Sequence, residues 1–244
     1  IGQMGFWTGD DVYWGAELAA EDINAVGGIL GRPLEIIRGH ANEFISVPDC
    51  VVVTEKLIAI DGVKAIAGPC RSEAVLAVRD VCADYGVLSI SSGEGSEEPQ
   101  KRLATDYERY KYRIRLVGNT FLLGTTDAAY MTGMIADVIR EELGIERPKL
   151  VIMSEKALWA EELAASFRLA VEEAGCELVG EWWPSPMATD VTAELTAIKA
   201  SGAHIIYQIL TGPVTIAFVK QWQALEVPAA LTGINGAMWD FAAF

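Results

Sequence analysis

Residues 65–75 read AIAGPCRSEAV: an apolar run, a Gly-Pro break, a polar triplet and a second apolar segment. A short apolar run bounded by turn residues is typical of a buried strand, and a predicted helix begins at Glu73. In open parallel sheets, ligands bind beyond the carboxyl ends of the strands, where the following helix presents unpaired N–H groups. The break at residues 68–72 is therefore a candidate binding loop.

The alternation of strand and helix continues on both sides of this loop. Nearly continuous apolar runs predict parallel strands at residues 1–6, 33–38, 63–68 and 87–91, with helices at 13–26, 48–60 and 73–85. After a polar segment at 94–109 the pattern restarts, with strands at 110–116, 149–154, 176–183, 204–210 and 229–234 and helices at 120–143, 159–174, 191–200 and 213–225. The sequence thus predicts an α/β protein of two doubly wound parallel-sheet lobes.

The chain is expected to pass between the lobes near residues 117–119. The first lobe then covers residues 1–117 and the second covers 118–236, while 237–244 would begin a return crossover to the first lobe. A junction between two such lobes is a preferred place for a small ligand.

Composition narrows the class of partner. The chain has 244 residues, 51% of them hydrophobic, and a formal net charge of −15 that disfavours nucleic acid and anionic lipid surfaces. No apolar run reaches the roughly 18 to 20 residues of a membrane span, and residues 1–6 lack the basic flank of a secretion signal. Either the chain is cytoplasmic or its signal has been removed.

Metal and redox chemistry find no support in the cysteines and histidines. The four cysteines lack C-x-x-C spacing and a neighbouring histidine, and a disulfide is not expected. His204 opens an apolar strand, where a structural role is expected. No G-x-G-x-x-G follows the first strand, and neither a P-loop nor a G-x-S-x-G elbow is present. We expect no cofactor and no enzymatic activity.

A specific resemblance emerges from three segments. The run EDINAVGGILGRPLE at 21–35, with TGD at 8–10 and GPCRS at 68–72, resembles the type I periplasmic binding proteins, and more narrowly their leucine/isoleucine/valine-binding branch. The resemblance implies two lobes joined by hinge crossings, which close on a ligand for delivery to an ABC importer. It also implies a monomer in the periplasm or outside the cell, either free or held by a lipid anchor. Family members continue past the residue at which this sequence stops, so a missing C-terminal part is expected.

A ligand-sensing domain of a receptor or regulator is the alternative, because such domains share this fold. A permease gene beside the coding sequence would favour transport, whereas a fused membrane span or kinase would favour sensing.

In the first lobe, Cys70, Arg71 and Ser72 are the predicted carboxylate seat. Ser72 offers a hydroxyl and an amide, and Arg71 a fork of donors. The resemblance implies that Ser72 binds a ligand carboxylate; alternatively, Ser72 only caps a helix beginning at Glu73 while Arg71 faces solvent. The next loop places Gly93 and Gly95 where the family supplies a carbonyl and a hydroxyl, and Glu94 or Ser96 could compensate for the missing hydroxyl.

In the second lobe, the resemblance implies that Trp159 stacks on the ligand, that Thr211 stands where an aromatic residue is usual, and that Asn235 replaces the acid that pairs with an ammonium. Trp159 could instead be surface packing. Because Asn235 is neutral, an α-amino acid becomes a weaker candidate unless Glu94 substitutes. Trp14, with Trp7 and Tyr13, would suit an aromatic carboxylic acid or an amide, although Trp7 and Trp14 could equally be surface packing.

Overall fold

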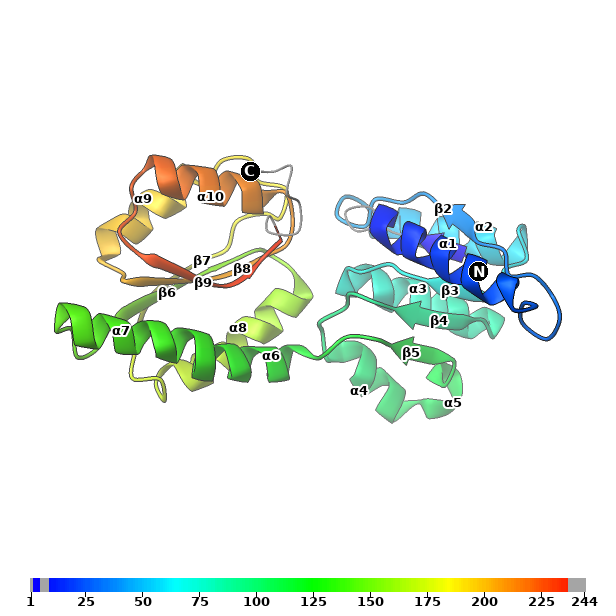
Figure 1. Ribbon diagram of the computed structural model, residues 1–244, viewed down its shortest axis with the longest axis horizontal. Helices are drawn as coiled ribbons and strands as arrows, with labels where there is room; N and C mark the ends of the chain where they lie inside the picture. Colours follow the sequence, from blue (N-terminus) through cyan, green and yellow to red (C-terminus); the bar gives the residue numbers. More distant parts are fainter. Residues whose placement is uncertain (1, 5–8, 237–244) are drawn as a thin grey trace. The chain divides into compact units, whose positions relative to one another are not determined.

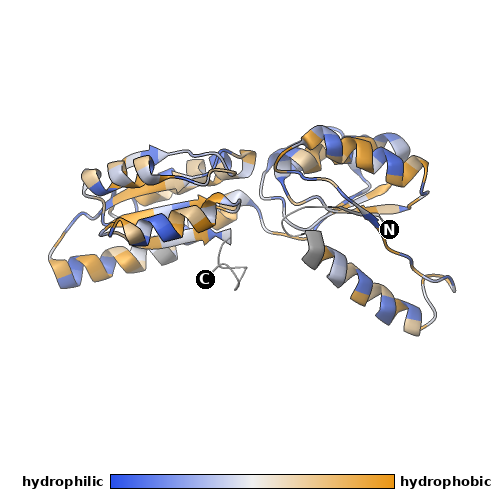
Figure 2. Cartoon of the chain, turned by 90° about the horizontal axis from the view of Figure 1, so that it is seen from above, coloured by the Kyte–Doolittle hydropathy of each residue, from blue (hydrophilic) through white to orange (hydrophobic). Residues whose placement is uncertain are grey.

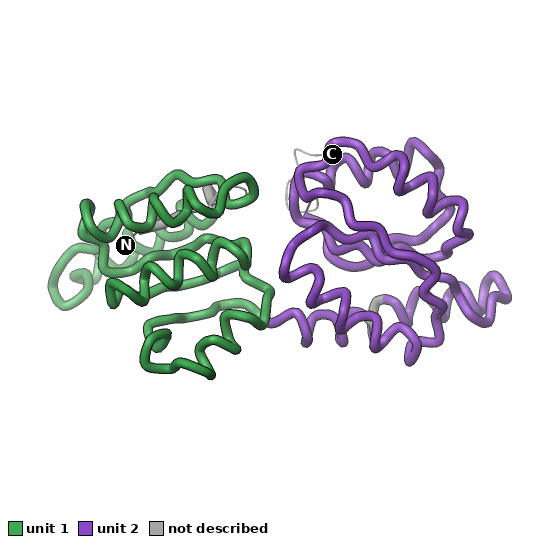
Figure 3. Tube along the Cα trace, turned by 180° about the vertical axis from the view of Figure 1, so that it is seen from behind, with its two compact units in different colours: residues 1–118 green, residues 119–244 purple. Residues whose placement is uncertain are grey.

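A computed structural model describes residues 2–4 and 9–236, and the predicted return crossover at 237–244 lies outside that range. The chain divides into two compact units, Ile1–Gly118 and Asn119–Phe244 (Figure 3). Each unit is built on its own parallel sheet, with strand order β2-β1-β3-β4-β5 in unit 1 and β7-β6-β8-β9 in unit 2 (Figure 1). The prediction of two α/β units with parallel sheets is confirmed.

Unit 1 has short strands. In chain order its elements are β1 (Gly2–Met4), α1 (Gly9–Ala25), β2 (Ile37–Gly39), α2 (Val47–Ala59), β3 (Ala65–Ala67), α3 (Ser72–Tyr85), β4 (Leu88–Ser91), α4 (Glu98–Thr105), α5 (Tyr107–Tyr110) and β5 (Arg113–Arg115). Helix α2 begins where Ser46 accepts a hydrogen bond from the Asp49 N–H, and α3 ends at Gly86, whose φ of 64° is left-handed. A core formed by α2, α3 and β3, including Leu57, Ile66 and Val78, holds these elements together.

Unit 2 has longer, more deeply buried strands. Its elements are α6 (Thr120–Asp127), a π-helical turn η1 (Ala128–Thr132), α7 (Gly133–Leu143), β6 (Lys149–Ser154), α8 (Leu158–Val171), β7 (Glu177–Trp182), α9 (Thr192–Ser201), β8 (Ile205–Leu210), α10 (Val214–Ala224) and β9 (Ala230–Asn235). Every residue of β8 is buried. The helices carry both hydrophobic and hydrophilic residues, as amphipathic helices packed on a sheet do (Figure 2).

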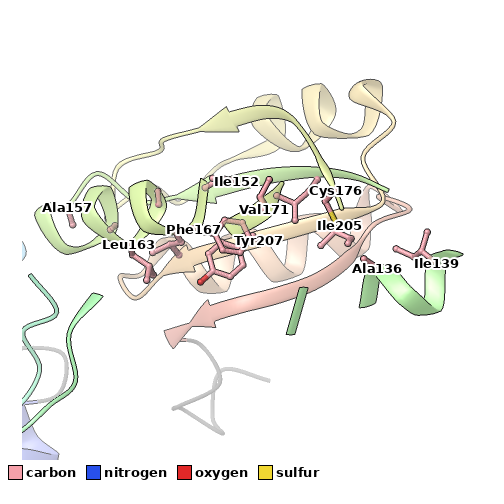
Figure 4. Packing of buried hydrophobic residues seen from close by; sticks show 14 residues of the cluster. Ala136, Ile139, Ile152, Ala157, Leu163, Phe167, Val171, Cys176, Ile205 and Tyr207 are labelled. Carbon is pink, nitrogen blue, oxygen red and sulfur yellow. The ribbon is translucent and has the colours of Figure 1, made fainter. Parts of the chain in front are cut away.

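Hydrophobic cores cover both faces of the unit 2 sheet. One face packs against α7 and α8, where the Phe167 and Tyr207 rings stack with centroids 3.6 Å apart (Figure 4). The other face packs against α9 and α10 through residues such as Leu195 and Phe218. A strand covered on both faces is mostly apolar, which explains why β6 and β8 stand out in the sequence.

Two sequence predictions of secondary structure are corrected. The segment 94–109 contains α4 and α5, which its polar composition concealed. Pro99 at the start of α4 accepts a hydrogen bond from buried Arg79, and Asp106 caps α5 by accepting from the Arg109 N–H. The expected single helix at 120–143 is interrupted by the π-helical turn η1. The sequence did not reveal this turn, because one wide turn leaves the apolar pattern almost unchanged.

Candidate functional site

The carboxyl ends of β3 and β4 form the candidate site of unit 1. These strands are parallel neighbours, with Ala67 opposite Ile90. Gly68, with a φ of 92°, turns the chain out of β3 and donates from its N–H to the Ile90 carbonyl at 2.9 Å. A Cβ atom on Gly93 would lie 2.7 Å from the Cβ of Cys70, so the two loops touch. The predicted residues Cys70 and Gly93 are thereby brought together.

Ser72 lies at the first residue of α3. Its side chain is only 1% exposed, and its Oγ accepts a hydrogen bond from the Ser96 N–H at 3.3 Å. The helix begins at Ser72 rather than Glu73, and Arg71 at the N-cap position makes no side-chain cap. The first N–H groups of a helix have no partner within it and carry a partial positive charge, so this end of α3 suits an anion.

Glu43, which sequence reasoning missed, supports this loop from the segment after β2. Its Oε2 accepts hydrogen bonds from the N–H groups of Cys70 and Arg71, both at 2.8 Å, and the side chain is buried. The carboxylate thus occupies two of the backbone donors that we expected to face a ligand. The sequence signal that could have identified Glu43 is its position shortly after a strand of the same sheet, because the carboxyl ends of parallel strands share one edge.

The expected role of Arg71 is corrected by its contacts. Its guanidinium binds Glu73, with Nε 3.0 Å from Oε2, and donates to the Phe44 carbonyl at 3.3 Å. The side chain is 17% exposed, so it neither reaches freely into solvent nor presents an open fork.

Glu94 is likewise committed inside the unit. Its carboxylate is 0% exposed and forms an ion pair with Arg113, with Arg115 Nε 3.8 Å away. Burial, followed by the charges of Arg79 and Arg115, lowers the pKa of Arg113 to about 10. The expectation that Glu94 compensates as a partner for a ligand ammonium is therefore corrected.

Arg115 holds the loop that contains Gly95. Its guanidinium donates to the carbonyls of Gly95 at 2.9 Å, Ser96 at 3.1 Å and Gly118 at 2.8 Å. The loop between β4 and α4 is therefore fixed on one side by Ser72 and on the other by β5.

Glu155 organises the candidate site of unit 2. It follows β6, and its Oε2 accepts from the N–H groups of Thr211 and Gly212 at 2.8 and 2.9 Å. Its Oε1 accepts from the Thr211 hydroxyl at 2.8 Å and from Trp159 Nε1 at 3.3 Å. The predicted residues Trp159 and Thr211 are thus joined through an acid that sequence reasoning passed over. Trp159 is also partly buried against the α7–α8 core, which matches the packing alternative.

Asn235 ends β9 directly beside the Thr211 loop. It pairs with Leu210 in the sheet register, and a Cβ on Gly236 would lie 2.8 Å from the Thr211 carbonyl oxygen. Its side chain is buried and donates from Nδ2 to Gln208 Oε1 at 2.7 Å. Asn235 therefore joins the unit 2 cluster as a neutral, hydrogen-bonded amide.

The aromatic residues of α1 are placed differently. Trp14 is 64% exposed and contacts Tyr13 edge to face, while the guanidinium of Arg38 lies 4.8 Å above the Tyr13 ring. This arrangement is surface packing on α1. Trp7, the third aromatic residue proposed from the sequence, lies outside the described residues.

A hollow with a volume of about 430 Å³ lies on unit 2 and is lined by Lys156, Glu161, Arg168 and Trp183. Within this hollow, Arg168 binds Glu181 through two contacts of 2.5 and 2.7 Å, and the Trp183 indole donates to the same carboxylate. Formation of this pair lowers the pKa of Glu181.

The potential metal ligands of the described residues are dispersed, and most of the cysteine side chains are buried. Within residues 2–4 and 9–236, no group of three or more His, Cys, Asp or Glu side chains could hold a metal ion. Cys50, Cys82 and Cys176 are buried free thiols, and burial raises the pKa of Cys50 to about 11 and that of Cys82 to about 12. Among the helices of the same residues, none is long and apolar enough to cross a membrane.

Comparisons with known proteins agree with this architecture. The chain is 24% identical over 246 residues to an amino acid binding protein of Pseudomonas aeruginosa, covering 98% of this chain and 61% of the relative. It is 25% identical to the Leu/Ile/Val-binding protein BraC3 of Rhizobium johnstonii, covering 93% of this chain and 57% of that protein. The chain thus spans about three fifths of the length of these relatives.

Solved structures show the same fold. The isoleucine complex of LivJ from Streptococcus pneumoniae matches with a TM-score of 0.77 and 22% identity, covering 97% of this chain and 64% of that one. A benzoate complex of a solute-binding protein from R. palustris matches with a TM-score of 0.76 and 17% identity, covering 99% and 64%. The sequence model of the family described as periplasmic binding protein matches residues 2–242. This chain therefore belongs to the periplasmic binding protein family.

Proposed function

We propose that this chain is the ligand-recognising part of a solute-binding protein that serves an ABC importer outside the cytoplasmic membrane. It captures a small carboxylate and performs no chemistry on it. The observation that carries the proposal is the meeting of the β3 and β4 loops at the start of α3, where Ser72 and the first-turn N–H groups offer donors to an anion. Partners are then the small ligand and a membrane permease.

The ligand docks its carboxylate at Ser72, and Trp159, Thr211 and Asn235 of unit 2 complete recognition. Ligand-driven closure requires contacts with both units, because a ligand shifts an equilibrium only by its difference in affinity for two states. The unit 2 residues supply an indole surface and neutral polar groups, held together through Glu155 and the β8–β9 edge.

An aromatic carboxylic acid is the ligand class that we favour over an α-amino acid. An ammonium group needs a carboxylate partner when it is removed from water. Glu94 is taken by Arg113, Glu43 and Glu155 accept from backbone N–H groups, and Asn235 is neutral. Related solved structures contain both kinds of ligand, 4-hydroxybenzoate and benzoate in some and isoleucine in another.

A thermal-shift series tests the proposal. A ligand that binds only the folded state raises the melting temperature in proportion to the logarithm of its concentration over Kd. Benzoate and 4-hydroxybenzoate are expected to raise the melting temperature of this chain, and the uncharged analogue benzyl alcohol is not. A response to isoleucine alone would contradict the choice of ligand class, and an equal response to benzoate and benzyl alcohol would contradict the carboxylate seat.

A further inference from the structure

The Glu155 carboxylate accepts hydrogen bonds from two separate segments of unit 2. One carboxylate accepts from Trp159 Nε1 on α8, from the Thr211 hydroxyl, and from the N–H groups of Thr211 and Gly212 before α10. Its own N–H donates to the Ile209 carbonyl of β8 at 3.0 Å. The residue is 1% exposed, so these contacts are made away from bulk water.

The donors match what a carboxylate can accept. An ionised carboxylate is an acceptor only, with about four lone-pair positions, and four donors reach Glu155. Hydrogen bonds to a charged group are shorter and stronger than neutral ones, which offsets the cost of burying the charge. The side chain is therefore held in one place and holds its partners in turn.

We propose that Glu155 is a positioning residue for ligand recognition, which fixes the Trp159 indole and the Thr211 hydroxyl relative to each other. The consequence for binding rests on the proposed function, whereas the positioning itself does not. Glutamine has the same shape but carries an NH₂ group, which would face N–H donors instead of accepting from them. Glu155→Gln therefore removes part of the acceptor set while conserving volume.

Amide hydrogen exchange of the isotope-labelled chain tests the positioning directly. Loss of a hydrogen bond to a charged group corresponds to roughly tenfold or more in the local opening equilibrium, so the Thr211 and Gly212 amides are expected to exchange at least about tenfold faster in Glu155→Gln. The matched control is Glu161→Gln, an exposed acid in the first turn of α8. Unchanged protection of both amides in Glu155→Gln would overturn the proposal.

A double-substitution cycle links the carboxylate to the indole. Trp159→Phe keeps a ring and removes the N–H donor, and its spectrum identifies the indole signal by its loss. The Trp159 indole signal is expected to shift in Glu155→Gln but not in Glu161→Gln. If Glu155 acts through Trp159, Trp159→Phe weakens benzoate binding less in the Glu155→Gln background than in the unsubstituted chain.

Measuring benzoate affinity distinguishes a role of Glu155 in ligand recognition from a role in folding alone. We expect Glu155→Gln to weaken benzoate binding about tenfold with far-ultraviolet circular dichroism unchanged. If Glu155→Gln kept full benzoate affinity while its Thr211 and Gly212 amides exchanged faster, the proposed role of Glu155 in recognition would be overturned. If the unsubstituted chain binds neither benzoate, 4-hydroxybenzoate nor isoleucine, the proposed function fails, while the exchange result still decides whether Glu155 positions Trp159 and Thr211.

Discussion

In both units, a buried glutamate accepts hydrogen bonds from the backbone N–H groups that follow the third strand of the unit. The two glutamates differ in whether they also bind side chains. Glu43 comes from the segment after β2 and accepts from the main chain of Cys70 and Arg71. Glu155 directly follows the neighbouring strand β6 and also holds the Trp159 and Thr211 side chains. Unit 1 thus presents mostly backbone, and unit 2 presents organised side chains.

This difference suggests a division of labour under the proposed function. A backbone seat with Ser72 recognises a group common to many solutes, the carboxylate. A side-chain cluster built on Trp159 and Thr211 changes more readily with sequence and can read the remainder of the ligand. Substitutions in unit 1 should therefore reduce affinity for all carboxylates alike, whereas those in unit 2 should change the order of preference among them.

The largest expected effect concerns the interior of unit 1. Glu94→Gln leaves Arg113 buried without its carboxylate, and loss of one partner of a buried pair costs about 3 to 5 kcal/mol of unfolding free energy. Urea denaturation measures this change. The control Glu98→Gln breaks a solvent-accessible, half-buried pair with Arg102 and should cost no more than about 1 kcal/mol. Equal costs would show that the Glu94 pair is not a structural support of the loop.

Glu43→Gln comes next and is the unit 1 counterpart of Glu155→Gln. Since Oε2 accepts from two N–H groups, the loss should be about 1.5 to 3 kcal/mol of stability and should free the Cys70 and Arg71 amides to exchange. Hydrogen exchange measures the response. If the effect of Glu43→Gln reached Trp159 instead, the separation of the two clusters would be wrong.

Ser72→Ala probes the seat itself. Removal of its hydroxyl should weaken binding of benzoate and 4-hydroxybenzoate equally, by about 1 to 3 kcal/mol, through a lost hydrogen bond. Isothermal calorimetry gives the affinities, and Ser92→Ala in the neighbouring loop is the control. Loss of one ligand with retention of the other would place specificity in unit 1 and contradict the division proposed above.

The smallest effect concerns the pH dependence of unit 2. Burial raises the pKa of Asp127, against the opposing hydrogen bond donated by Tyr207 at 2.7 Å. The unfolded chain therefore releases this proton first, and stability falls as pH rises from the ordinary aspartate value through the folded one. Asp127→Asn should flatten the melting temperature over that window, while exposed Asp137→Asn should not. A wild-type-like slope in Asp127→Asn would contradict this assignment.

The sequence predicted correctly those strands whose apolar composition indicates that they are buried. The apolar runs at 149–154 and 204–210 coincide with β6 and β8 to within one residue, because strands covered on both faces leave little room for polar side chains. It also placed Ser72 and Gly93 on adjacent strand ends, since the order of parallel strands brings those ends to one edge. The helices α4 and α5 were not predicted, because polar contacts rather than an apolar pattern hold them in place.

The distant partners of the buried carboxylates are what the sequence could not supply. Glu43 reaches Cys70 across 27 positions, and Glu155 reaches Thr211 across 56. Glu94 was considered for a ligand because nothing in its neighbourhood along the chain reveals Arg113. Such choices depend on three-dimensional distances that apolar periodicity does not encode.

A crystal structure of this chain grown with 4-hydroxybenzoate tests the central claim most directly. The account predicts a carboxylate oxygen within hydrogen-bonding distance of Ser72 Oγ and of an N–H group in the first turn of α3, with Glu43 still bound to Cys70 and Arg71. A ligand carboxylate bound away from the β3 and β4 loops, with Ser72 making no contact to it, would contradict the account.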